Sequence, residues 1–333
     1  MPLPTLLLTL GDPNGIGPEV VLKAAPLVSD VARVVAVGGA ATLRAQAEAL
    51  GLGLVAEVAS PDEAVPPGTL AVLDPAPGSP VDYAWGETSA VGGRAAIAAI
   101  ERAVALCTAG RADGLVTAPI SKEAIHAAGS PFPGHTEMLQ ALTGAGTVVM
   151  LLAADLDAGP LRVALATVHV PVSAVAALVT QARVEAVCAT LADALAGALG
   201  VERPRLALLG LNPHAGDGGV LGGEERDVIA PAVAALRARG IDAAGPFPAD
   251  AFFGRRGWLR VDAVVAMYHD QGLAPFKALA QGSGVNITLG LPVVRTSPDH
   301  GTAFDVAGQG VADPSSMVAA VRMAAAMAAR RRA

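Results

Sequence analysis

The sequence predicts an α/β protein built on a mostly parallel sheet covered by helices. Short apolar runs typical of strands alternate with alanine-rich helical stretches along the 333 residues, and this alternation is typical of successive βαβ units. The chain is 53% hydrophobic and only 16% charged, so it can build a sizeable core and lacks the composition of a disordered chain. A chain of this length is expected to form two domains.

The elements can be placed from apolar runs, helix caps and glycine stops. Strands are expected at residues 6–10, 34–37, 114–118, 148–152, 161–167, 206–211 and 286–294. Helices are expected to start at Pro18 and to cover residues 41–50, 89–109, 121–129, 172–199, 224–239 and 315–332. These helix limits follow from proline at the first helical position, serine at N-caps and glycine after the last turn. The stretch 61–85, rich in proline and glycine, is expected to be irregular.

Composition excludes several classes of function. Aromatic residues make up 3% of the chain and the net charge is −7, which argues against nucleic acid as a partner. The two cysteines, Cys107 and Cys188, lie in helical patterns and indicate buried thiols in a reducing compartment. No apolar run approaches the roughly 18 residues of a membrane span, and no targeting segment is evident. We therefore expect a cytoplasmic protein without a membrane partner.

Three strand-like runs each end in a histidine. The histidines are His169, His214 and His269, half of the six in the chain. Because the carboxyl ends of strands in an open α/β sheet face a common crevice, the three imidazoles could meet around one divalent metal and leave a coordination position for substrate. Neutral imidazoles suit zinc, cobalt or iron. The alternative for each histidine alone is a hydrogen-bonded side chain at a strand end.

Aspartates near these histidines could complete the ligand shell or orient the rings. They are Asp217, Asp250 and Asp270.

A second set of residues suits an anion. Lys277, Asn286 and Arg295 follow His269 at nine-residue steps, and a lysine with an arginine can hold a phosphate or carboxylate. The alternative is two unrelated surface cations. The turn 134–137 (GHTE) opens a helix whose N–H groups could face an anion. Residues 11–19 (GDPNGIGPE) have the same form but lack the full dinucleotide fingerprint.

Five segments carry a resemblance to a known family. They are residues 11–19 (GDPNGIGPE), 134–137 (GHTE), 210–219 (GLNPHAGDGG), 267–273 (MYHDQGL) and 285–308 (VNITLGLPVVRTSPDHGTAFDVAG). Over nearly its whole length the chain resembles the 4-hydroxythreonine-4-phosphate dehydrogenases of vitamin B6 biosynthesis. Residues 300–308 (HGTAFDVAG) also resemble the adenosine-binding loop of the isocitrate and isopropylmalate dehydrogenases. The chain departs from the family pattern at Asn14, where alanine is common.

The resemblance implies two α/β/α domains with a central cleft, a fold like that of the isocitrate and isopropylmalate dehydrogenases. The first domain is expected to be discontinuous, with residues 1–128 and 299–333. The second, residues 129–298, is expected to carry most metal and substrate ligands. The resemblance also implies a homodimer whose active site lies at the subunit interface.

The implied reaction is oxidation of 4-phosphohydroxy-L-threonine by NAD or NADP, followed by decarboxylation to 3-amino-2-oxopropyl phosphate and CO₂. It would require one divalent metal: zinc, magnesium or cobalt. Carried over by motif, the metal ligands are His169, His214 and His269. The substrate-binding residues are His135, Thr136, Lys277, Asn286 and Arg295. The cofactor-binding residues are His300, Gly301, Thr302 and Asp305, in the loop that resembles the adenosine site. Lys277 is also the candidate base for the substrate hydroxyl.

Other functions stay open from the sequence. A sister dehydrogenase could act on phosphorylated threonate or erythronate, or on an aromatic dihydrodiol. A three-histidine zinc hydrolase would use metal-bound hydroxide and need no nicotinamide, which leaves residues 300–308 without a role. A phospho-ligand sensor could use the same scaffold without catalysis. Fold alone does not decide among them.

Overall fold

The computed structural model describes residues 2–332, and its contacts divide the chain into two compact units. Unit 1 contains Met1–Ala145 and Leu291–Ala333, and unit 2 contains Gly146–Gly290. These limits differ from the domain boundaries expected at 128/129 and 298/299. Helix α5 (His135–Thr143) packs on helix α3 (Ala90–Thr108), and strand β12 (Val294–Pro298) pairs with β5 (Gly114–Thr117), so both belong to unit 1.

Unit 1 is built on an all-parallel sheet with the strand order β3-β4-β2-β1-β5-β12. Its remaining strands are β1 (Thr5–Thr9), β2 (Arg33–Val37), β3 (Leu54–Glu57) and β4 (Thr69–Leu73). The order reverses direction at β1, because β2 lies on one side of it and β5 on the other. Ligands of open α/β sheets bind at such a switch point, beyond the carboxyl ends of the strands.

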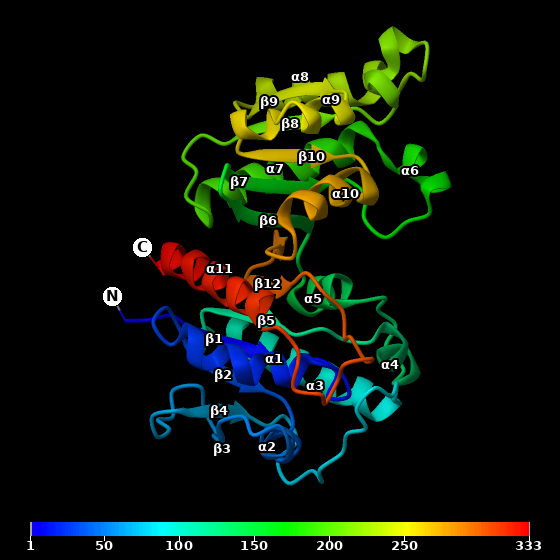
Figure 1. Cartoon of the computed structure of the whole chain (residues 1–333). Coiled ribbons are helices and arrows are strands. Elements are labelled where there is room, and N and C mark those ends of the chain that lie inside the picture. Colours follow the sequence, from blue (N-terminus) through cyan, green and yellow to red (C-terminus); the bar gives the residue numbers. More distant parts are fainter. Residues whose placement is uncertain (1, 333) are drawn as a thin grey trace. The chain divides into compact units, whose positions relative to one another are not determined.

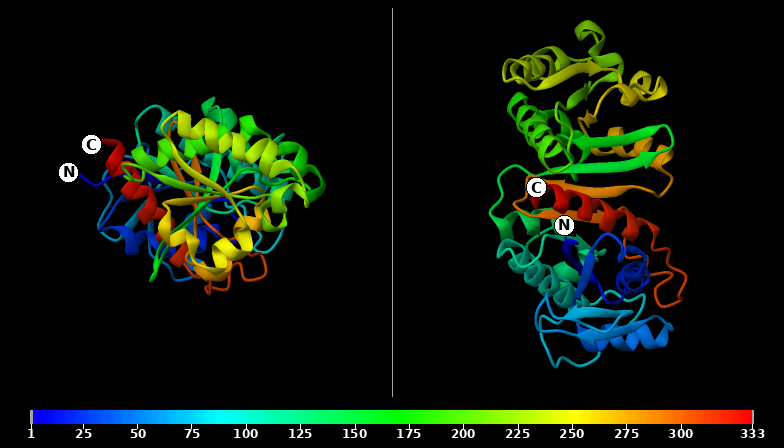
Figure 2. Two further views of the ribbon diagram at one scale, coloured as in Figure 1. Left: turned by 90° about the horizontal axis from the view of Figure 1, so that it is seen from above. Right: turned by 90° about the vertical axis from the view of Figure 1, so that its left-hand side faces the viewer.

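Helices of unit 1 form two groups around this sheet (Figure 1). The first group contains α1 (Gly17–Ala24), α2 (Ala40–Ala49) and the C-terminal α11 (Ser315–Arg332), with the short 3₁₀ turn Ala25–Val28. The second contains α3, α5 and the short α4 (Lys122–Ala127). Helix α11 also packs on β12 and β5, so the two chain ends share one unit, and α11 lies beside α1 in both views of Figure 2.

Unit 2 has a mixed sheet with the order β11-β6-β7-β10-β8-β9. Its strands are β6 (Val149–Leu156), β7 (Gly159–Leu165), β8 (Arg205–Leu209), β9 (Asp242–Phe247), β10 (Ala263–Ala266) and β11 (Val285–Leu289). Strands β7, β10, β8 and β9 are parallel neighbours, whereas β6 runs antiparallel to both β7 and β11.

Unit 2 contains α-helices and several shorter helical turns. The α-helices are α6 (Val172–Leu178), α7 (Gln181–Gly197), α8 (Ala230–Ala238), α9 (Ala249–Gly254) and α10 (His269–Ala280). Shorter turns are the 3₁₀ segments Pro213–Gly219 and Gly257–Arg260 and the π-helical turn Glu225–Ile229. Helix α7 packs on α8, and α10 packs on strands β6, β7 and β10.

Two expected elements are each divided in the structure. The helix expected at 172–199 is two helices, α6 and α7, which meet at an angle of 87°. Thr180 starts the second one, because its side chain accepts a hydrogen bond from the Arg183 N–H at 3.2 Å as an N-cap. The strand expected at 286–294 ends at Leu289, because Gly290 adopts φ +85° and a Cβ there would lie 2.2 Å from the Thr147 carbonyl oxygen.

The stretch 61–85 was expected to be irregular, but it contains strand β4. Among residues 2–332 no single helix is long and apolar enough to cross a membrane, and only the bent pair α6 and α7 passes the same test jointly, by length and composition.

Candidate functional site

In unit 2 the three histidines follow three neighbouring parallel strands. His169 comes four residues after the end of β7, His214 five residues after β8, and His269 three residues after β10. Strand β10 pairs in parallel with both β7 and β8. The carboxyl ends of the three strands therefore lie at one edge of the sheet, as the sequence pattern indicated, although each strand ends before its histidine.

Two of these histidines lie close together. The ring centroids of His169 and His269 are 5.8 Å apart, and both rings line a cavity of about 220 Å³. The Nδ1 atom of His269 is 2.7 Å from Oδ1 of Asp270. When Nδ1 carries the proton it donates to this carboxylate, and Nε2 keeps the lone pair that a metal would use. Asp270 thus has the orienting contact expected of it.

His214 lines a second cavity, of about 500 Å³, together with Asp250. Tyr268 and Asp270 line both cavities, so the two spaces adjoin. Within residues 2–332, no group of three or more His, Cys, Asp or Glu side chains is close enough to hold a metal ion. The donors suit a divalent metal chemically, but this arrangement brings only two of the three imidazoles together.

The loop that carries His214 has a strained backbone. Six successive residues, from His214 to Gly219, have positive φ, beginning with 53° at His214. Non-glycine residues rarely adopt this region, and such strain persists only where the surroundings impose it. The buried carboxylate of Glu225 does so: its Oε1 accepts the N–H groups of Leu211 at 2.7 Å and Asn212 at 2.6 Å. Glu225 was not recognised from the sequence, where it lies in an ordinary helical pattern.

The other predicted ligands of unit 2 lie on α10 and β11. Lys277 is exposed in the last turn of α10. Asn286 is the second residue of β11, and its Oδ1 atom is buried without a hydrogen-bond partner. A buried acceptor of this kind costs stability unless a ligand or water satisfies it, so Asn286 keeps the properties expected of a substrate ligand.

Unit 1 contains a buried cationic group. Arg295 lies in β12, is only 2% exposed, and donates from Nη2 to the Thr117 hydroxyl at 2.7 Å. Burial lowers the pKa of Arg295 to about 10, so the guanidinium still carries its charge at neutral pH. A buried charge is retained where an anion can compensate it.

His135 and Thr136 belong to the same unit, at the start of α5. The Nε2 atom of His135 is buried without a hydrogen-bond partner. Burial, reinforced by the positive charge of Arg295, holds the pKa of His135 well below its ordinary 6.5, so the imidazole is neutral at pH 7. The sequence had placed all three of these residues in the second domain.

The loop after β1 occupies the switch point of the unit 1 sheet. Residues 11–19 are buried, and the Asp12 N–H donates to the Pro119 carbonyl, just after β5, at 3.0 Å. The Ile16 N–H donates to the Thr302 carbonyl at 3.0 Å. A Cβ at Gly15 would lie 2.8 Å from that same carbonyl oxygen. The GDPNGIGPE segment and the loop that contains the predicted cofactor residues therefore pack on one another.

Buried polar atoms without partners mark both loops. They are Oδ2 of Asp12 and Nε2 of His300, while Gly301 and Asp305 of the same loop are exposed. Burial raises the pKa of Asp12. Close backbone approach together with unsatisfied polar atoms suits the cradle of a bound ligand, and the residues present fit a dinucleotide.

Asn14 has a structural role that the sequence did not indicate. Its Oδ1 accepts the Ala84 N–H at 2.8 Å, and its Nδ2 donates to the Glu87 carbonyl at 2.7 Å and to the Ser89 hydroxyl at 3.1 Å. Its own carbonyl accepts the Gly86 N–H at 2.9 Å. The side chain is thus fully used in fixing the loop before α3, and this departure from the family pattern supports the fold.

Known proteins match the chain over almost all of its length. The family model described as "Pyridoxal phosphate biosynthetic protein PdxA" matches residues 30–324. The 4-hydroxythreonine-4-phosphate dehydrogenase of Caulobacter vibrioides is 48% identical, with 98% of each chain covered. A crystal structure of the enzyme of that name from Klebsiella pneumoniae is 40% identical with a TM-score of 0.85, covering 98% of this chain and 99% of that one.

A less similar structure carries a different name. The terephthalate 1,2-cis-dihydrodiol dehydrogenase of Burkholderia xenovorans is 30% identical, with a TM-score of 0.68 and 98% of each chain covered. The fold, the site residues and these matches define an α/β dehydrogenase. The chain belongs to the PdxA family, the dehydrogenases of pyridoxal phosphate biosynthesis.

Proposed function

We propose that the chain oxidises 4-phosphohydroxy-L-threonine with NAD or NADP and releases CO₂ to give 3-amino-2-oxopropyl phosphate. The observation that carries this proposal is the full-length similarity to dehydrogenases named for this substrate, with 48% identity to the Caulobacter vibrioides protein. The residues expected to bind the substrate are His135, Thr136, Lys277, Asn286 and Arg295.

Arg295 and His135 suit the phosphate of the substrate. The buried guanidinium supplies a fixed positive charge, and a neutral imidazole beside it can donate one hydrogen bond without adding charge. Remote anchoring of this kind uses binding energy to orient the reacting carbon. Lys277 is the candidate base that takes the proton of the hydroxyl as the hydride leaves.

The dinucleotide would accept the hydride, and the residues that hold it would be His300, Gly301, Thr302 and Asp305. In support, their loop packs on the GDPNGIGPE segment at the switch point of the sheet. The role of the protein here is to hold the reactive ring and exclude competing reactions.

A divalent metal, zinc, magnesium or cobalt, would be held by His169, His214 and His269. It would lower the pKa of the substrate hydroxyl and stabilise the negative charge that develops during decarboxylation. For His214 to join the other two, its left-handed loop has to move, and the exposure of the His214 ring leaves it room. The working enzyme is proposed to be a cytoplasmic homodimer.

The deciding experiment is the absorbance of reduced nicotinamide. Purified protein is mixed with NAD⁺ or NADP⁺ and 4-phosphohydroxy-L-threonine, with and without a chelator. Reduction that the chelator abolishes and an added divalent metal restores is the expected result. No reduction by metal-replete protein would contradict the proposal.

A second candidate substrate is an aromatic cis-dihydrodiol, favoured by the match to the Burkholderia xenovorans enzyme. An aromatic diol has no phosphate for the buried Arg295 to compensate. Arg295→Gln should therefore raise the KM for a phosphorylated substrate by about 10-fold or more, because a charge-assisted hydrogen bond is lost, and should leave turnover of an aromatic dihydrodiol without a carboxylate unchanged. Turnover of the diol alone would favour the second candidate.

A further inference from the structure

Unit 1 contains a large cavity at the amino ends of its strands. The loops described above follow the carboxyl ends of the strands, on the other side of the sheet's long axis. The cavity has a volume of about 980 Å³, within the range of small-molecule sites. It is lined by residues at or near the starts of strands, among them Leu3 before β1, Arg33 at the start of β2, Leu54 at the start of β3 and Thr69 at the start of β4. The proposed catalytic residues lie elsewhere, so this cavity needs its own explanation.

The wall of this cavity is largely apolar and contains no acidic residue. Leu3, Leu27 and Leu54 line it with 47%, 53% and 70% of their surface exposed. Large apolar side chains exposed together mark a binding surface more often than singly exposed ones do. The charged side chains in the wall are Lys23 and Arg33, and no Asp or Glu is among its lining residues. Although the chain has a net charge of −7, a wall with two cationic side chains and no carboxylate favours an anionic ligand over a cationic one.

The two cations differ in how far they are compensated. Lys23 forms an ion pair with the buried Glu19 at 2.7 Å and donates to the carbonyls of Gly310 and Ala312, each at 2.8 Å. Its charge and its donors are therefore satisfied.

Arg33 has no such partner. Its Nε donates to the Pro61 carbonyl at 2.9 Å and its Nη2 to the Glu63 carbonyl. Across residues 2–332 no carboxylate pairs with Arg33, and its Nη1 donates to no protein group. Carbonyl oxygens fix the position of the guanidinium but leave its net charge, so Arg33 presents an oriented, uncompensated donor in the cavity wall.

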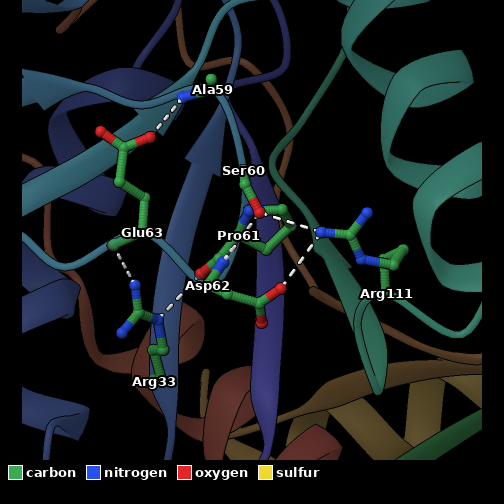
Figure 3. Close-up of polar contacts among 7 residues, drawn as sticks. All are labelled: Arg33, Ala59, Ser60, Pro61, Asp62, Glu63 and Arg111. Atoms are coloured by element: carbon green, nitrogen blue, oxygen red, sulfur yellow. Dashed lines mark hydrogen bonds and ion pairs between the residues drawn. The ribbon is translucent and has the colours of Figure 1, made fainter.

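A second arginine holds the same loop independently of the cavity. Arg111 donates from Nη2 to the Ser60 hydroxyl at 3.0 Å and pairs with Asp62 at 3.1 Å. Figure 3 shows the two guanidinium groups beside residues 60–63. Arg33 comes from strand β2, and Arg111 comes from the loop between α3 and β5. After this loop, the Thr69 N–H closes a turn onto the Pro66 carbonyl at 3.1 Å, with Gly68 at φ +78°. The chain around the cavity is therefore ordered before any ligand binds.

We propose that this cavity binds a small amphipathic anion, an apolar ring or short chain with a single carboxylate, sulfonate or phosphate. The apolar part contacts the exposed leucines, and the anionic group accepts hydrogen bonds from Nη1 of Arg33. Binding here does not depend on the dehydrogenase activity, because the cavity lies at the amino ends of the strands and the proposed catalytic loops follow their carboxyl ends.

The test uses two fluorescent probes of similar apolar size. One is 8-anilinonaphthalene-1-sulfonate, and the other is N-phenyl-1-naphthylamine, which lacks the sulfonate. The full-length protein, saturated with NADP⁺ to occupy any dinucleotide site, should bind one sulfonate probe per chain and bind the neutral probe about 10-fold more weakly or worse. Equal affinity for the two probes would overturn the proposal.

Matched variants locate the site. Arg33→Gln should weaken the sulfonate probe about 10-fold or more and leave the neutral probe unchanged, whereas Arg111→Gln, which removes a cation that does not line the cavity, should leave the ratio of the two affinities unchanged. Leu27→Glu places a negative charge in the wall without disturbing the Arg33 contacts and should weaken the sulfonate probe alone. Sulfonate binding that survives both Arg33→Gln and Leu27→Glu would place the anion elsewhere and refute the proposal.

Discussion

The side chain of Gln271 joins the loop of His214 to the segment of His269 through the Gly210 carbonyl. Its Nε2 donates to this carbonyl at 2.6 Å, and its Oε1 accepts the Met267 N–H at 2.6 Å. One amide therefore ties together two strand ends that each carry a proposed metal ligand. Outer contacts of this kind orient metal ligands and contribute strongly to metal affinity.

We expect Gln271→Leu to weaken metal binding about 10- to 100-fold and to lower the free energy of unfolding by about 1–3 kcal/mol, since two partly buried backbone groups lose their partners. Titration of apo-protein with Co²⁺, followed by visible absorbance, measures the first effect, and urea unfolding measures the second. Gln181→Leu is the control, because the Gln181 side chain donates to Glu185 on an exposed surface, at 2.8 Å, far along the chain from the proposed metal ligands of the two strand ends. Unchanged Co²⁺ affinity in the Gln271 variant would show that Gln271 contributes to stability and not to metal binding.

Asn14 offers a test of the coupling between two loops of unit 1. The loop that Asn14 fixes contacts residues 300–308: Trp85 packs so closely on Gly308 that a Cβ there would lie 2.3 Å from the indole ring. Asn14→Ala removes three side-chain hydrogen bonds and should cost about 2–3 kcal/mol, at about 1 kcal/mol each.

The same variant should raise the Kd for NADH, because the cofactor loop loses its support, and should speed amide hydrogen exchange in residues 84–89. Thr180→Ala removes a helix cap in unit 2 and should reduce stability without changing the Kd for NADH. Equal Kd values for Asn14→Ala and the unmodified protein would show that the two loops act independently.

Local signals predicted much of the fold. Ser121 caps α4 as expected, and Ser89 caps α3 at the expected start of that helix, because capping depends on residues within one turn. Strand β9 (DAAGPF) was missed because it has no apolar alternation, and β3 because its four residues are only partly buried. The break at Thr180 was missed because it interrupts an otherwise continuous apolar helical pattern.

The sequence predicted the parts of the site that depend on where strands end. It did not predict the parts that depend on hydrogen bonds between residues far apart in the chain. Histidines that follow strands can be placed at one sheet edge from sequence alone. The hydrogen bonds from Gln271 to Gly210, from Asn212 to Glu225 and from Asn14 to Ser89 join residues 61, 13 and 75 positions apart, and no local pattern marks them. The strained turn at His214 has one local signal, the glycines at 216, 218 and 219 that tolerate positive φ.

Asp12 should destabilise the folded protein at neutral pH. Its Oδ2 is buried without a partner, and burial raises its pKa. A carboxyl whose folded pKa is raised holds its proton more tightly in the folded state, so its contribution to stability is lost as the pH rises above the ordinary 3.8 and through the folded pKa. Asp12→Asn keeps the acceptor for the Asn14 N–H, which lies 3.0 Å from Oδ1, and removes the buried charge.

We therefore expect Asp12→Asn to unfold at a higher urea concentration than the unmodified protein at pH 7.5, by about 1 kcal/mol in free energy. Turnover should fall, since a costly unpaired group at the switch point is one that function retains. A variant less stable at pH 7.5 would show that the Asp12 charge is compensated in the folded protein.

His135 should make the protein less stable in mild acid. Its pKa in the folded protein lies well below the ordinary 6.5 because of burial and the nearby Arg295 charge. Below about pH 6.5 the unfolded chain takes up a proton that the folded protein refuses, so the free energy of unfolding falls with falling pH, by at most about 1.4 kcal/mol per pH unit for this one group. The effect fades as the pH rises above 7, because the unfolded imidazole then also loses its proton.

Urea unfolding at pH 5.0, 6.0 and 7.0 measures this slope. His135→Gln should flatten the loss of stability between pH 6.5 and 5.0, because glutamine does not titrate, whereas the matched variant His126→Gln, at an exposed histidine, should keep the slope of the unmodified protein. Arg295→Gln should weaken the effect partway, since it removes the second of the two causes and leaves the burial. Parallel slopes for the unmodified protein and His135→Gln would mean that His135 is accessible to protons in the folded state, and the neutral imidazole beside Arg295 would have to be abandoned as a phosphate donor.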